Sequence, residues 1–129
     1  MPDLEIAVEK VCELIDYAHA IDVKVDVVEP GYGSDATDDD MREILEAYAE
    51  DPSFEQAQEF IEGLNVDEQV ALVALAWLGR GTFTVEDWDE ALAEARDAHN
   101  KHTATYLLGI PLLGDYLEEA LNELGYSCD

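Results

Sequence analysis

The chain has 129 residues, of which 48% are apolar, and its 32 acidic residues against 6 lysines and arginines give a formal net charge of −26. This length fits a single domain with a core of its own, and the apolar content argues against disorder. So negative a chain repels DNA, RNA and anionic membrane surfaces, so we expect neither nucleic acid nor membrane as a partner; it favours basic partners, divalent cations or solubility in salt.

The N-terminal region predicts one helix followed by an irregular segment. Apolar residues recur at helical spacing between acids from about Asp3 to Ala20, as in an amphipathic helix. Residues 23–28 then alternate and are rich in valine, which is typical of a short strand or an extended arm. Pro30 to Gly33 follows as a loop signal. We therefore expect an irregular loop or a short extended arm at about 22–36.

Two more helices are predicted before the middle of the chain. Thr37 or Asp38 can cap a second helix, because the carboxylates that follow suit the positive end of the helix dipole. The residues 51–53 (Asp-Pro-Ser) end it. Ser53 can cap a third helix, whose apolar residues run from Phe54 to Leu64.

The segment from Val70 to Leu78 is apolar on every side, unlike the rest of this acidic chain. Such a helix is buried all round or lies in a membrane, and this one is too short for a membrane. Asn65 and Glu68 have the spacing of a capping box that opens it. We therefore expect a central helix at about 66–78, with four residues nearly fully buried: Val70, Val73, Ala74 and Trp77.

Arg80 follows the central helix between two glycines. Gly79 or Gly81 supplies the positive φ that helix ends commonly require. In the structural interpretation, Arg80 reaches the last carbonyls of the helix and favours the negative end of its dipole. In the functional interpretation, it is a cation exposed at a turn that can hold a carboxylate or a phosphate.

Thr84 and Asp87 form a near-match to another capping box, which opens a fifth helix that runs to about His99 or Lys101. Two imidazoles three residues apart on a helix can share a metal ion, which makes His99 and His102 candidate ligands. The alternative is that both are solvent-exposed histidines near a fraying helix end.

The C-terminal region predicts two more helical segments. Residues 103–108 indicate a short helix that stops at Gly109. Pro111 fits the first turn of a last helix, whose apolar face runs from Leu113 to Leu124. Aromatic residues near the central helix are core residues or interface anchors, since both uses are common; they are Trp77, Trp88, Tyr106 and Tyr116.

The cysteines and the N-terminus bear on the cellular compartment. Cys12 and Cys128 lack C-x-x-C spacing, which indicates neither a zinc site nor a disulfide framework. The chain begins MPDLEIAVEK, with acids where a signal peptide carries positive charge. No apolar run approaches the roughly 18 residues of a membrane span. We expect a soluble, cytoplasmic protein with reduced cysteines.

The segment from Asn65 to Gly125 resembles an uncharacterised bacterial family, a domain of unknown function. The resemblance rests on AWLGRG at 76–81, on Trp88, and on YLLGIPLLGDYLE at 106–118. It implies a small bacterial protein of mostly helical structure. The family has no assigned catalytic residues to carry over.

Together these observations predict an all-α single domain over residues 1–129, with five to six helices packed around the helix at about 66–78. We expect a small acidic, non-catalytic binding or interaction protein that needs no cofactor and whose partner is a protein or a second copy. Its candidate contact residues are Arg80, Trp88, Tyr106 and Tyr116. The alternative is a carboxylate-dependent or metal-dependent enzyme that uses residues around Arg80 or the His99–His102 segment.

Overall fold

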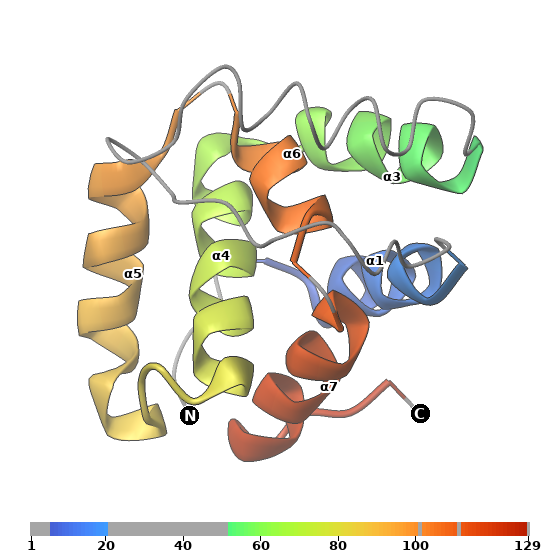
Figure 1. Cartoon of the computed structure of the whole chain (residues 1–129). Coiled ribbons are helices and arrows are strands. Elements are labelled where there is room, and N and C mark those ends of the chain that lie inside the picture. Colours follow the sequence, from blue (N-terminus) through green and yellow to red (C-terminus); the bar gives the residue numbers. More distant parts are fainter. Residues whose placement is uncertain (1–5, 21–51, 101, 111, 129) are drawn as a thin grey trace.

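The computed structural model describes residues 6–20, 52–100, 102–110 and 112–128 (Figure 1). Within these ranges every regular element is helical, which confirms the all-α prediction. The elements are α1 (Val8–Ala20), α3 (Pro52–Glu62), α4 (Val66–Arg80), the 3₁₀ turn η2 (Val85–Asp87), α5 (Trp88–Ala98), α6 (Thr103–Leu108) and α7 (Leu113–Glu123). The predicted second helix and the predicted loop or arm at about 22–36 lie outside the described residues.

Helix α4 is the central element, as its apolar sequence predicts. It packs against α5, α6 and α7, and Figure 1 shows it between α5 and α7. Helices α1 and α3 pack on each other, α1 also packs on α7, and α3 also packs on α6. Eight residues of α4 are buried: Val70, Ala71, Leu72, Val73, Ala74, Leu75, Ala76 and Leu78.

Trp77 departs from the expectation of near-complete burial, because it is only partly buried. Its indole N–H donates a hydrogen bond of 3.0 Å to the Tyr106 hydroxyl, and its ring lies 5.9 Å from that of Phe83. A tryptophan combines a large apolar body with one polar N–H, so the edge of a core suits it better than the centre.

The predicted capping box at the start of α4 is present. Asn65 Oδ1 accepts from the backbone N–H of Glu68 at 2.7 Å, and Glu68 Oε1 accepts from the backbone N–H of Asn65 at 3.0 Å. Glu68 also forms an ion pair of 2.6 Å with Lys10, which links α4 to α1. The Lys10 ammonium, together with the Asn65 N–H, holds the pKa of the Glu68 carboxyl below its ordinary value of 4.5.

The two glycines at the end of α4 have different roles. Gly81 takes the left-handed conformation, with φ of 96°. Its N–H donates to the Leu78 carbonyl at 3.1 Å, and the N–H of Thr82 donates to the Trp77 carbonyl at 3.0 Å. This pair of bonds is the Schellman motif that glycine favours after a helix. Gly79 instead lies within the helix.

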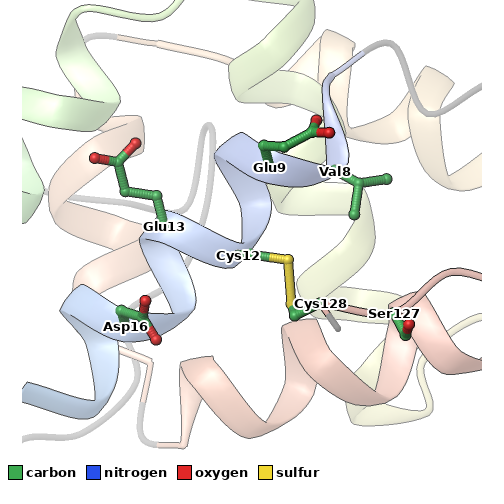
Figure 2. Close-up of a pocket in the computed structure, with 7 residues that line it drawn as sticks. All are labelled: Val8, Glu9, Cys12, Glu13, Asp16, Ser127 and Cys128. Atoms are coloured by element: carbon green, nitrogen blue, oxygen red, sulfur yellow. A yellow bond between two sulfur atoms is a disulfide. The ribbon is translucent and has the colours of Figure 1, made fainter.

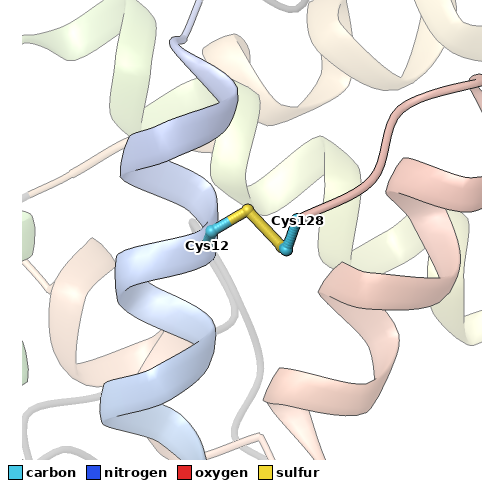
Figure 3. Close-up of a disulfide and its surroundings, with 2 residues drawn as sticks. All are labelled: Cys12 and Cys128. Atoms are coloured by element: carbon cyan, nitrogen blue, oxygen red, sulfur yellow. A yellow bond between two sulfur atoms is a disulfide. The ribbon is translucent and has the colours of Figure 1, made fainter.

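Cys12 and Cys128 form a disulfide, so the prediction of two reduced cysteines is wrong for this structure (Figure 3). Their Cα atoms lie 5.6 Å apart, an ordinary separation for a disulfide, although 116 positions separate them in sequence. The bond ties the middle of α1 to the segment that follows α7. Spacing rules detect cysteines that are close in sequence, and this pair is brought together only by the packing of α1 on α7.

Candidate functional site

A pocket of about 440 Å³ lies between α1 and the C-terminal segment (Figure 2). One wall is a face of α1, the other is the chain beyond α7, and the disulfide bridges them. The lining residues are Val8, Glu9, Cys12, Glu13, Asp16, Ser127 and Cys128.

The α1 wall carries three exposed carboxylates, those of Glu9, Glu13 and Asp16. Their spacing of four and then three residues places them along one face of the helix. Like charges at these spacings repel one another and slightly destabilise an isolated helix. The lining includes no lysine or arginine, so the pocket has a negative potential that nothing in its own walls offsets.

The opposite wall is short and held at two points. The N–H of Tyr126 donates to the Leu121 carbonyl at 2.7 Å, which turns the chain back after α7. Two residues later, the disulfide fixes Cys128 against α1. Ser127, between these two points, adds a hydroxyl to the pocket.

This arrangement suits a cationic ligand. Three carboxylates and a hydroxyl can accept several N–H donors, and charge-assisted hydrogen bonds are about twice as strong as neutral ones. A guanidinium matches a carboxylate through two parallel bonds, while an ammonium acts as a point charge. Val8 and the disulfide offer apolar surface to the methylene groups of such a side chain.

The first residue predicted from the sequence, Arg80, lies at the C-terminal end of α4, and none of the pocket residues comes from that helix. Its Nε donates to the Thr82 hydroxyl at 3.1 Å. The carbonyls of Trp77 and Leu78 accept from the backbone N–H groups of Thr82 and Gly81. Whether Arg80 also binds an anion stays a prediction.

The three aromatic candidates are distributed between core and surface. Trp88 is 3% exposed and Tyr106 is 2% exposed, so both belong to the core. Tyr116 is partly buried and packs against the core from α7. The structure brings Tyr106 to Trp77 through the indole hydrogen bond and places Trp88 at the start of α5.

The two candidate metal ligands do not share a helix. His99 follows the end of α5 at Ala98, and His102 precedes the start of α6 at Thr103. Within the described residues, no group of three or more His, Cys, Asp or Glu side chains has the geometry for a metal ion.

His99 has a hydrogen-bond partner of its own. The Gln69 Nε2 amide donates to the carbonyls of Ile61 at 2.9 Å and Leu64 at 3.2 Å. This fixes the Gln69 Oε1 as an acceptor, and His99 Nε2 lies 2.7 Å from it. His99 Nε2 therefore carries a proton, and that nitrogen has no lone pair for a metal ion.

Sequence reasoning assigned no role to the pocket residues. The available signal was the spacing of Glu9, Glu13 and Asp16 around Cys12. In a chain with 32 acids, however, such spacing also arises on any solvated helix face. The second wall comes from the opposite end of the sequence, so no local pattern connects it to α1.

Residues 55–126 match the model of a family described as Protein of unknown function (DUF3775), which covers more than half of the chain. The chain belongs to this family. The match includes α4, α5, α6 and α7, in agreement with the resemblance carried by Asn65 to Gly125. No curated protein and no solved structure matches the chain.

The family match and the pocket involve different residues. Every lining residue of the pocket, from Val8 to Asp16 and at Ser127 and Cys128, falls outside 55–126. The matched region supplies helices on which α1 packs, and the residues outside it supply the acidic lining of the pocket. Among the described residues, no helix is long and apolar enough to cross a membrane.

Proposed function

We propose that this DUF3775 protein is a small, non-catalytic binding protein whose acidic pocket receives a basic side chain of a partner protein. The observation that carries the proposal is the lining of the pocket: three carboxylates and one hydroxyl on an exposed surface, with no basic residue among them. An arginine fits this chemistry best, because its planar fork can bind one carboxylate through two parallel bonds while the other carboxylates attract its charge.

The charge of the whole chain favours a basic partner over a second copy. Two copies at −26 each repel one another, whereas a basic protein is attracted over a distance set by the ionic strength. Electrostatic attraction of this kind raises the association rate more than it slows dissociation. The proposal takes the chain as a single domain that acts in the cytoplasm without a cofactor.

Fluorescence anisotropy with labelled peptides tests the proposal. An arginine-rich peptide should bind, a glutamate-rich peptide of equal length should not, and added salt should weaken binding. The triple variant Glu9→Gln, Glu13→Gln, Asp16→Asn should weaken binding of the basic peptide by about tenfold or more, as loss of several charge-assisted bonds implies.

The chain offers a matched control on α5. Glu90, Glu94 and Asp97 repeat the residue types and spacing of the pocket acids and are exposed. Figure 1 shows α5 and α1 on opposite sides of α4. The variant Glu90→Gln, Glu94→Gln, Asp97→Asn removes the same charge and should bind the peptide like the parent. Equal weakening by both variants would trace binding to net charge and reject the pocket.

A further inference from the structure

The disulfide lies on the surface of the pocket and is not enclosed in the core. Cys128 is exposed, Cys12 is partly buried, and both line the pocket (Figures 2 and 3). Thiol reductants act by attack of a thiolate on a disulfide sulfur, so the rate depends in part on access to that sulfur. Because Cys128 is the more exposed residue of the pair, we expect small thiols that enter the pocket to attack its sulfur first.

The carboxylates of the pocket are expected to distinguish these thiols by their charge. The attacking species is an anion, and it enters a pocket whose lining includes Glu9, Glu13 and Asp16. Repulsion by three carboxylates slows a thiolate that carries only negative charge. A thiol with an ammonium group forms a thiolate that is neutral overall, and its ammonium can contact the same carboxylates.

We propose that Cys12–Cys128 is a thiol–disulfide exchange site that reacts preferentially with small cationic aminothiols. The aminothiol thiolate attacks Sγ of Cys128 and forms a mixed disulfide there. The Cys12–Cys128 bond breaks, and Cys12 leaves as a thiolate that takes a proton from water. This assignment rests on the exposure of Cys128 relative to Cys12.

A second aminothiol completes the exchange. Its thiolate attacks the aminothiol sulfur of the mixed disulfide and releases Cys128 as a thiolate, which is protonated in turn. Two aminothiols are thereby oxidised to one symmetrical disulfide, and one protein disulfide is reduced to two thiols. The electrons balance without a further oxidant or reductant.

Exchange in the native state requires that α1 stays in place after the bond opens. Helix α1 buries Val11, Leu14 and Ile15 and packs on α3 and α7. Its Lys10 also forms the 2.6 Å ion pair with Glu68 of α4. These contacts hold α1 in place without the covalent link.

The rate of reduction by three thiols of different charge tests the inference. The three thiolates differ in net charge: that of cysteamine is neutral overall, that of 2-mercaptoethanol is singly negative, and that of 2-mercaptoethanesulfonate is doubly negative. Alkylation and mass spectrometry follow reduction of the folded protein at low ionic strength. The rate at which each thiol reduces bis(3-hydroxypropyl) disulfide, a neutral disulfide that none of the three thiols forms, corrects for that thiol's own reactivity. The corrected rate constant should fall about tenfold per added negative charge, the size expected of three nearby carboxylates acting through water.

Two further measurements identify the cause of this preference. The pocket variant Glu9→Gln, Glu13→Gln, Asp16→Asn should flatten the rate series, whereas Glu90→Gln, Glu94→Gln, Asp97→Asn should retain it. Peptide mapping of the first mixed disulfide should place cysteamine on Cys128. Equal corrected rates for the three thiols, equal flattening by both variants, or a mixed disulfide on Cys12 would overturn the inference.

The exchange does not rest on the proposed binding of a partner protein, although both use the same carboxylates. A basic peptide that fails to bind while the aminothiol preference persists would remove the proposed function and leave this inference standing. Binding of the basic peptide without any preference among the thiols would reject this inference and leave the proposed function standing.

Discussion

At the scale of single residues, Gly79 sets how closely α4 and α7 approach. A Cβ atom added there would lie 2.8 Å from the Tyr116 Cα and would overlap the Tyr116 carbonyl group. The obstacle is backbone, which cannot rotate away, so α7 must move. We expect Gly79→Ala to lower the free energy of unfolding by about 3 kcal/mol, measured by urea denaturation.

Gly63 provides the matched control for this substitution. A Cβ atom there would meet only the carbonyl oxygens of Glu59 and Phe60, at 3.4 and 3.6 Å, which is ordinary contact. Gly63→Ala should therefore leave the stability within about 0.5 kcal/mol of the parent. Similar losses from both alanine substitutions would show that α4 and α7 do not meet through Gly79.

The two glycines at the end of α4 differ in whether the sequence alone predicts their role. The pattern around Arg80 predicted that one flanking glycine takes positive φ, and Gly81 does, because a helix end imposes this locally. The contact between Gly79 and Tyr116 depends on the docking of a distant helix. The contact between Cys12 and Cys128 likewise depends on the packing of distant helices, since 116 positions separate the two residues. For that reason the sequence could not predict the pocket that they line.

At the scale of helices, burial of α4 has a direct test in Val73. Its side chain is 0% exposed among apolar neighbours, so Val73→Asp buries a charge without a partner. We expect a loss of at least about 4 kcal/mol in the free energy of unfolding, or failure to fold. Thermal and urea unfolding measure it.

Val66→Asp is the matched control, because it makes the same chemical change at an exposed position of α4. Val66 is 49% exposed and begins the helix, where a carboxylate favours the positive end of the dipole. This variant should unfold within about 1 kcal/mol of the parent. A stable Val73→Asp protein with the parent's melting temperature would contradict the central position of α4.

Helices with a strong local pattern were predictable, and the parts that depend on tertiary contacts were not. An apolar segment with no polar face has to be buried, so α4 followed from its sequence alone. Its capping box followed too, because Asn65 and Glu68 are neighbours in sequence. The sequence did not predict the partial burial of Trp77, because this depends on where Tyr106 of α6 lies.

At the scale of the whole molecule, the excess of acids cannot be neutralised within the chain. With 6 lysines and arginines for 32 acids, most carboxylates have no basic residue of their own. Ion pairs between helices include Lys10 with Glu68 and Arg96 with Asp67, at 2.6 and 2.7 Å. The acidic pocket is thus one part of a protein with acids in large excess, and its shape and its disulfide distinguish it from other exposed acids such as those on α5.

This unbalanced charge predicts that salt stabilises the fold. Folding brings the acids closer together than they are in the unfolded chain, and their repulsion destabilises the compact state. Added salt screens the repulsion, since the Debye length falls from about 30 Å at 0.01 M to about 10 Å at 0.1 M. The melting temperature should rise by several degrees over this range, as a gain of about 1 kcal/mol implies.

Sodium chloride and tetramethylammonium chloride should act equally, because screening depends on ionic strength and not on the cation. A melting temperature that ignores both salts would mean that bound cations already neutralise the acids, and a response to sodium alone would indicate a specific cation site.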